Sequence, residues 1–206
     1  MTTLANTAER DVASPPGGVL RARQAERVRL YKQQPGEAWT VDHATTRSEG
    51  PEANDPMHDT VRIASGFDVP VDIGVHRNLG GLHDSPTSGD VLCAALAACT
   101  DSTFRQVATK LGLPIEALAV DVQGEVDVRG ALCVAPEVPV GFQRMRVQVR
   151  ARLTGADERL ARKLEQAVEH CCIVLQTLRS GVPVDVAFHR EPPSPGTTGP
   201  DHPALG

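Results

Sequence analysis

Two long apolar helical segments, separated by two segments of alternating polarity, are the feature that most constrains the fold of this chain. Residues 89–112 and 156–178 repeat apolar side chains at helical spacing. Residues 118–130 and 142–155 between them alternate apolar and polar side chains, as half-buried antiparallel strands do. A helix with an apolar face must pack against another layer, so we predict an α+β fold in which antiparallel sheet covers two long helices.

Further strands are predicted on both sides of this central block. Residues 38–46 and 60–73 alternate in polarity, and the polar run 47–59 between them predicts a long hairpin loop. Residues 182–188 alternate after the second helix and predict a last strand. The loop 75–90, rich in Gly, Asp and His, leads into the first long helix, and loops of this kind often carry function.

The ends of the chain differ in composition from the middle. Residues 1–18 and 191–206 are rich in Pro and Gly and lack apolar periodicity, so we expect two disordered tails. Residues 19–34 form a weakly amphipathic pattern with a cationic outer face, which predicts a helix. We therefore expect a single domain over residues 19–190 that begins with this helix.

Charge and hydropathy exclude several classes of partner. The net charge of −5 offers no broad cationic surface, which argues against nucleic acid or an anionic membrane as the main partner. No segment approaches the roughly 20 apolar residues that span a bilayer, and the first residues lack the apolar core of a secretory signal. We expect a cytoplasmic protein whose five cysteines are free thiols.

The cysteines are the candidate reactive groups. On the first long helix, Cys99 shares one face with Leu92, Leu96, Thr103 and Val107, so it is expected to point toward the core. Free cysteine often acts only as a small buried hydrophobe, and this interpretation stands beside a reactive one. Cys171 and Cys172 are neighbours on the second helix, and Cys171 is expected to lie nearer its apolar stripe. Cys93 and Cys133 are expected to be structural.

Two motifs in the chain resemble the OsmC/Ohr family of thiol-dependent hydroperoxide reductases and their relatives. The first is GDVLCAALAACTDSTFR, and the second is CIVLQTLRSGVPV, about 70 residues further on. The family pattern places one cysteine on an Ala-rich helix and another at the start of a Cys-Pro-Val motif. Cys99 matches the first and Cys172 the second. The resemblance runs from about Val41 to Phe188 and implies an OsmC-like fold.

This resemblance also implies an activity. Cys99 would attack an organic hydroperoxide and become a sulfenic acid, and Cys172 would then form a disulfide with it. A dithiol reductant, either a lipoyl protein or a small thiol, would restore both thiols. No cofactor is implied, and the role would be antioxidant defence in the oxidative stress response. The family also forms intertwined homodimers, so a homodimer is expected.

The chain departs from the family pattern at two positions. Ile173 stands where a proline usually follows the second cysteine, and Gly89 stands in the slot of a glutamate ten residues before the first. In the family that glutamate holds an arginine beside the reactive thiol. The nearest carboxylate is Asp90, and the candidate arginines are Arg47 and Arg77, each of which could also be a solvated surface residue.

Several other residues are candidates for the substrate site. We expect it to be lined by His76, His83, Asp90, Leu96 and Cys171, although the histidines could also be ordinary loop residues and Cys171 could replace Cys172 as the resolving thiol. The histidine spacing matches no structural zinc pattern, so no metal is predicted. Two rival functions remain: a noncatalytic protein that binds a small apolar or thiol-bearing ligand, and a transferase or hydrolase with Cys99 as nucleophile.

Overall fold

The computed structural model describes residues 16–63 and 66–190. It contains four α-helices and two antiparallel sheets within these residues, which confirms the predicted α+β class. The helices are α1 (Pro16–Gln33), α2 (Ser88–Leu111), α3 (Glu158–Cys171) and α4 (Ile173–Ser180). The strands are β1 (Ala44–Thr46), β2 (His58–Ile63), β3 (Val69–Gly74), β4 (Ile115–Glu125) and β5 (Arg144–Leu153).

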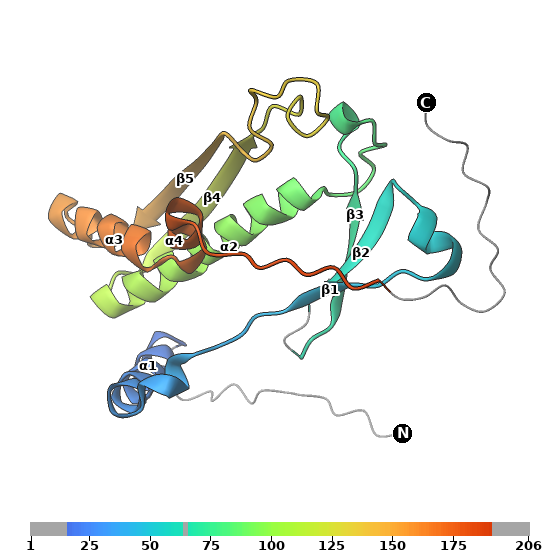
Figure 1. Ribbon diagram of the computed structural model, residues 1–206. Helices are drawn as coiled ribbons and strands as arrows, with labels where there is room; N and C mark the ends of the chain where they lie inside the picture. The colour runs from blue at the N-terminus through green and yellow to red at the C-terminus, as the bar shows by residue number, and fades with distance from the viewer. Residues whose placement is uncertain (1–15, 64–65, 191–206) are drawn as a thin grey trace, which may run out of the picture.

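The core lies where α2 meets the β4–β5 pair and α3 (Figure 1). Its buried side chains come mainly from the apolar faces of α2 and α3. They are Phe104, Val107, Ala108, Leu113, Leu164, which is only 1% exposed, and Val168. These positions recur at helical spacing, as the sequence predicts. The core thereby fixes α2, which carries Cys99, between the sheet and the second helical region.

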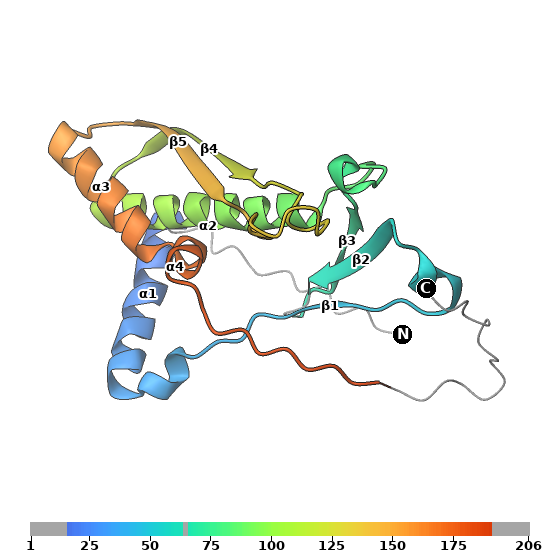
Figure 2. The same cartoon turned by 45° about the horizontal axis from the view of Figure 1, so that its top comes forward.

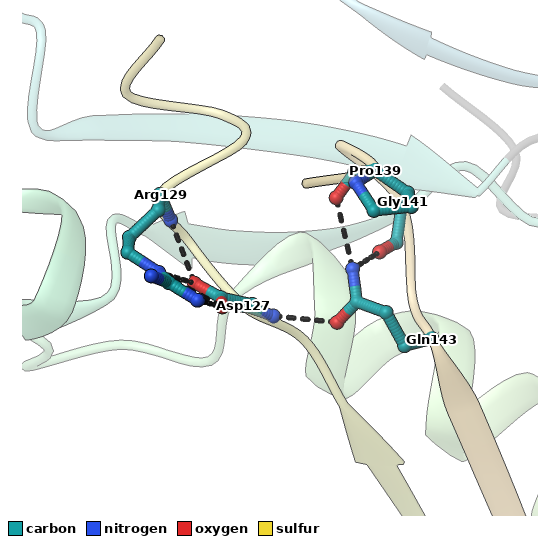
Figure 3. A network of polar contacts seen from close by, with 5 residues as sticks. All are labelled: Asp127, Arg129, Pro139, Gly141 and Gln143. Carbon is teal, nitrogen blue, oxygen red and sulfur yellow. Dashed lines mark hydrogen bonds and ion pairs between the residues drawn. The ribbon is translucent and has the colours of Figure 1, made fainter. Parts of the chain in front are cut away.

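Strands β4 and β5 form the predicted antiparallel pair, and the loop 126–143 that joins them is held by a compact polar network (Figure 3). The Gln143 side chain accepts a bond from the Asp127 N–H at 2.6 Å and donates bonds to the carbonyls of Pro139 and Gly141. The Asp127 carboxylate in turn accepts bonds from Arg129. These contacts close the loop at its base and position Phe142, which follows Gly141.

The prediction of the N-terminal sheet is wrong in its division into strands. Residues 60–73 were expected to form one strand, but they belong to two strands, β2 and β3, which pair antiparallel from His58↔Gly74 to Ile63↔Val69. Gly66 and Asp68 between them have φ angles of 87° and 48°, a left-handed conformation that suits a turn and not a continuous strand. Only Ala44–Thr46 of the predicted strand 38–46 pairs with β2.

The second long helix is not continuous. Residues 156–178 were expected to form one helix, but Cys172 has φ −73° and ψ 106° and separates α3 from α4. Its N–H still bonds the Val168 carbonyl, at 3.0 Å, and its own carbonyl accepts the first bond of α4 from the Gln176 N–H, at 3.0 Å. Cys172 therefore ends one helix and begins the next, which changes the direction of the chain beside α2.

The terminal predictions have mixed outcomes. Helix α1 begins at Pro16 and lies against α2, where Gln24 donates to Gln106 at 2.9 Å, so residues 16–18 are helical and not part of a disordered tail. Residues 1–15 and 191–206, where both tails were expected, lie outside the described residues. The prediction of a strand over residues 182–188 is wrong for this single chain. These residues follow α4 as an exposed segment that pairs with no strand among the described residues (Figure 2).

Candidate functional site

Helix α2 begins with a capping box that uses Asp90. The Thr87 side chain accepts a bond from the Asp90 N–H at 3.2 Å, while the Thr87 N–H and hydroxyl each donate to the Asp90 carboxylate at 2.8 Å. These bonds from Thr87, and secondarily the field of His83 and His76, hold the pKa of Asp90 below its usual value. Asp90 therefore stabilises the N-terminus of α2 as part of its capping box.

The slot of the missing glutamate is filled by an aromatic ring. A Cβ placed on Gly89 would lie 3.1 Å from Cζ of Phe142, and one on Gly124 of β4 would lie 2.5 Å from Cε1 of the same ring. Phe142 thus packs between two glycines, with no room for a larger side chain at either without movement. The polar group that the family pattern places here is replaced by an apolar contact.

Cys99 lies half-buried on α2, opposite the start of α4. The backbone N–H groups of Val174 and Ile173, in the first turn of α4, lie close enough to Cys99 to lower its pKa, against the effect of burial, which raises it. The first N–H groups of a helix have no partner within that helix, and the side chain of Cys172, which occupies the N-cap position of α4, caps none of them. The sulfur of Cys99 therefore lies beside the uncapped first turn of α4.

The structure brings Cys99 and Cys172 together. Cys172 is 0% exposed and lies close enough to Cys99 to help lower the pKa of that thiol, and both cysteines are free. Its neighbour Cys171 is exposed, whereas the sequence pattern placed Cys171 nearer the apolar stripe. That expectation fails because the helix ends between them, so the helical spacing that carried the pattern forward does not hold at Cys172.

The surroundings of Cys99 favour its thiolate. Burial on its own would raise the pKa of Cys99, but the hydrogen bonds from Val174, Cys172, Thr103 and Ile173 together bring that pKa below its usual value. Cys93, six residues earlier on α2, shows the opposite behaviour, because burial and then the nearby charge of Asp90 raise its pKa. From the sequence, only a nearby cation was expected to stabilise the Cys99 thiolate. The sequence did not show that a second helix starts at Ile173.

The loop before α2 gathers three of the predicted residues into a separate group. His76 and His83 lie with their ring centroids 4.3 Å apart, and Arg77 donates to Nδ1 of His83 at 3.4 Å. This group and Asp90 lie at the start of α2, whereas Cys99 is nine residues along it, a rise of about 14 Å. In this chain the group does not contact the thiols.

The remaining predicted residues lie in two different places. Arg47 borders a polar cavity of about 400 Å³ on the N-terminal sheet, together with Glu52, Asp55, His58 and Asp72. Leu96 is 1% exposed and lines a larger cavity of about 1040 Å³ between α2, β5, α3 and α4. Thr100, which contacts Cys172, lines the same cavity, so its apolar interior extends to the buried thiol.

Neither a metal centre nor a membrane-spanning helix is found within the described residues. No group of three or more His, Cys, Asp or Glu side chains converges there as metal ligands would. Within the same residues, every helix is too short or too polar to cross a lipid bilayer.

His58 is a titratable group that the sequence analysis did not single out. It stands at the start of β2 and bonds Asp55 through Nδ1 at 3.0 Å and Asp84 through Nε2 at 3.1 Å. Asp55 first and Asp84 second raise the pKa of His58 above its usual value. The imidazolium therefore links the loop before β2 to the loop that leads into α2.

We predict that this link strengthens the fold below the unfolded-state histidine pKa of about 6.5 and is lost as the pH rises through the higher folded-state value. The Asp84→Asn variant should lower the pKa of His58, which an NMR titration of its ring protons would measure. Asp42→Asn, which removes a carboxylate without a recorded contact to His58, serves as the matched control. An unchanged titration in Asp84→Asn would contradict the assignment.

With this geometry in view, the chain can be compared with known proteins. The model of the family described as OsmC-like protein matches residues 81–187, just over half of the chain. The chain belongs to the OsmC-like protein family. The matched range contains both long helical regions, β4, β5, Cys99 and Cys172, so the resemblance predicted from the two cysteine motifs is confirmed. No curated protein is similar enough to count as a match.

Solved structures agree with this fold. An OsmC-like protein of unknown function from Vibrio cholerae has a TM-score of 0.55 at 10% identity, over 68% of this chain and 94% of that one. An organic hydroperoxide resistance protein OsmC from Legionella pneumophila has a TM-score of 0.51 at 21% identity, over 69% and 91%. An organic hydroperoxide resistance protein from Elizabethkingia anophelis has a TM-score of 0.50 at 17% identity, over 70% of this chain and 92% of that one. At these identities the likeness establishes the OsmC-like fold and not the activity.

Proposed function

We propose that this OsmC-like protein is a thiol-dependent peroxidase that reduces organic hydroperoxides through Cys99 and Cys172. One observation supports the proposal: the half-buried Cys99 lies beside the first turn of α4 and the buried Cys172, and hydrogen bonding there lowers the pKa of Cys99 although burial alone would raise it. A cysteine at a helix N-terminus is favoured as thiolate, which is the nucleophilic form. A second thiol within reach provides the partner for a disulfide.

The reaction divides into two balanced steps. The Cys99 thiolate attacks one oxygen of the hydroperoxide, the O–O bond breaks, and the alkoxide takes a proton to leave as an alcohol, with Cys99 as sulfenic acid. The Cys172 sulfur then attacks the Cys99 sulfur, the S–O bond breaks, and the hydroxide leaves with the thiol proton as water. A dithiol, from a lipoyl protein or a small thiol, then reduces the disulfide by exchange.

The other predicted site residues would have secondary roles in this reaction. Arg47 or Arg77 would stabilise the thiolate, although in this chain neither contacts Cys99, so either role requires loop movement or a second subunit. His76, His83, Asp90, Leu96 and Cys171 would border the substrate path. We also propose that the protein acts in the cytoplasm in the oxidative stress response, because a reducing compartment would keep its thiols available for reaction.

The direct test is consumption of cumene hydroperoxide in the presence of dihydrolipoamide. The proposal expects turnover that saturates with both substrates and follows a ping-pong pattern, because peroxide and dithiol react with different states of the enzyme. Turnover no faster than the dithiol alone, from protein that is folded and fully reduced, would contradict the proposal.

A noncatalytic binding function is the second candidate, and one observation favours it. The cavity of about 1040 Å³ is lined mostly by apolar side chains of α2, β5 and α3, and Phe142 occupies the place of the family glutamate. A cavity of this kind suits a small apolar ligand. Saturable binding of such a ligand without peroxide turnover would favour this function over the first.

We also propose that the protein is a homodimer, as the family resemblance implies. Large apolar side chains are open to solvent on segments that pair with nothing else in the described chain, including Trp39 at 88% and Phe188 at 90% exposed, with Val41, Val182, Val184 and Val186. An open row of alternating apolar residues is a site for strand pairing or association.

The expected result in sedimentation velocity at micromolar concentration is a species of about twice the chain mass of 21.9 kDa. Val184→Glu together with Val186→Glu should shift the protein toward monomer, because the two charges would have to be buried on association. Asp185→Asn, between them, is the control and should leave the dimer intact. A compact monomer of the unchanged protein under these conditions would overturn the proposal.

A further inference from the structure

The helix break at Cys172 exchanges one hydrogen-bond donor for another. In a continuous helix the N–H of Ile173 would donate to the carbonyl of Glu169, four residues earlier. The extended ψ of 106° at Cys172 turns the Ile173 N–H away from that carbonyl. The Glu169 carbonyl instead accepts a bond from the side-chain amide of Gln176, at 2.6 Å. A carbonyl that the break separates from its helical donor is therefore satisfied by a residue of the next helix.

Gln176 connects the two sides of the break. Its own N–H bonds the Cys172 carbonyl at 3.0 Å, so its backbone belongs to the start of α4, while its side chain reaches back to the last turn of α3. Arg179 makes a second link, from Nη1 to the Glu169 carboxylate at 3.1 Å. Both side chains of this ion pair are more than half exposed, and an exposed pair contributes little to stability. Gln176 is therefore the stronger of the two links where α4 turns away from α3 (Figure 2).

The break determines which of two adjacent cysteines is buried. Helical spacing carried through residue 172 would place Cys171 on the apolar stripe of Leu164 and Leu175 and would turn Cys172 about 80° away from Leu164. The structure has the opposite order, because Cys171 is exposed and Cys172 is 0% exposed. Sγ of Cys172 lies 3.7 Å from Oγ1 of Thr100, on α2. The contact that keeps the helix broken thus also selects the thiol that faces α2.

The local sequence by itself favours a continuous helix. Apolar residues continue at helical spacing on both sides of Cys172. Ile173 also has an N–H that can extend α3, unlike a proline, which lacks this donor and crowds the preceding turn. The two arrangements therefore compete for one acceptor, the Glu169 carbonyl, which takes either the Ile173 N–H or the Gln176 amide.

We propose that Gln176 is a positioning residue: by donating its side-chain amide to the Glu169 carbonyl, it keeps the helix broken at Cys172 and makes Cys172, not Cys171, the thiol that faces α2. The effect on the helix is independent of any activity. The effect on the resolving step rests on the proposed function, in which Cys172 forms the disulfide with Cys99.

The test is alkylation of the two adjacent cysteines by iodoacetamide in the reduced, folded protein, with each site quantified by tandem mass spectrometry. Gln176→Met keeps the length and helix propensity of the side chain but removes the donor. It should raise the ratio of Cys172 to Cys171 alkylation about fivefold, the shift that loss of one hydrogen bond gives. Gln166→Met replaces an exposed glutamine of α3 and is the matched control, which should leave the ratio unchanged.

A second substitution should rescue the first. Ile173→Pro added to Gln176→Met should return the ratio to that of the unchanged protein, because proline has no N–H to offer the Glu169 carbonyl and suits the first position of a helix. Cys172 already has the extended conformation that a following proline requires. A general loss of packing would not be repaired in this way, so the rescue separates a role in the break from a merely structural one.

Three results would overturn the proposal: an unchanged ratio in folded Gln176→Met, an equal rise in Gln166→Met, or a ratio that stays raised after Ile173→Pro is added. Should Gln176→Met not fold, Gln176→Ala removes the same donor and is expected to give the same shift and the same rescue.

Peroxide gives the readout that depends on the proposed function. After one equivalent of cumene hydroperoxide, Gln176→Met should divert part of the disulfide from Cys99–Cys172 to Cys99–Cys171, which peptide mapping would show. A disulfide confined to Cys99–Cys172 in this variant would overturn the effect on the resolving step. If the alkylation ratio shifts and is rescued but no disulfide forms in any variant, the proposed function fails while the role of Gln176 in the helix break stands.

Discussion

Replacing Cys99 with serine is expected to abolish turnover of organic hydroperoxides. Serine has the size and polarity to take the same place, but its hydroxyl stays protonated at neutral pH and is a far weaker nucleophile toward the O–O bond than a thiolate. Because serine is close to cysteine in size and Cys99 is only half-buried, the packing of α2 should change little and the fold should survive. The measurement is cumene hydroperoxide consumption with dihydrolipoamide, which should fall to the rate of the dithiol alone.

Cys93→Ser is the matched control for this prediction. Cys93 lies on the same helix and is also half-buried, yet its pKa is raised by burial where that of Cys99 is lowered by its hydrogen bonds. The control should retain most of the activity. Activity that persists in Cys99→Ser, or that disappears equally in Cys93→Ser, would show that Cys99 is not the attacking thiol.

Replacing Cys172 with serine is expected to allow one oxidation and then stop turnover with small dithiols that cannot reduce the sulfenic acid quickly. Cys99 remains able to attack, but no second thiol is within reach to expel the hydroxide. Because a buried serine can still share a hydrogen bond with the Thr100 hydroxyl, the surrounding packing should change little. A single burst of alcohol, equal to the enzyme concentration, is the expected measurement.

The adjacent Cys171 supplies the control. Cys171 is exposed whereas Cys172 is 0% exposed, so Cys171→Ser should turn over as the unchanged protein does. If Cys171→Ser stalls and Cys172→Ser does not, then the chain near α4 must rearrange during the reaction, and the assignment of the resolving thiol is wrong.

The central layers could be predicted because their patterns are local. The alternation along β4 and β5 and the helical spacing along α2 each reflect one buried face, and one-sided burial is what periodicity records. The N-terminal sheet was harder, since its strands are mostly exposed and alternate only weakly. The turn at Gly66 and Asp68 depends on a conformation that the alternation around it does not mark.

The break at Cys172 could not be predicted from its own neighbourhood. The family pattern has a proline after this cysteine, which would mark the first residue of a new helix, but Ile173 carries no such signal. Apolar residues on both sides continue at helical spacing, so one long helix was the natural interpretation. The first turn of α4 lies beside Cys99 only because the helix breaks here. Its effect on the Cys99 thiol was therefore not predicted.

The packing of Phe142 against Gly89 could not be predicted from the sequence either. Phe142 is 53 positions away from Gly89, and only the pairing of β4 with β5 and the closed loop between them bring the ring onto α2. The sequence showed that the glutamate is missing, but not what replaces it. Long-range packing of this kind leaves no local pattern.

The most direct test of the account is mass spectrometry of the reduced protein after one equivalent of cumene hydroperoxide. Digestion without reduction should yield a peptide pair joined by a Cys99–Cys172 disulfide, with Cys93, Cys133 and Cys171 still free. Blocking with dimedone during the reaction should trap the sulfenic acid on Cys99 alone. A folded protein in which Cys99 remains a free thiol after this treatment would contradict the account, and the cysteine would then be a packing residue of α2.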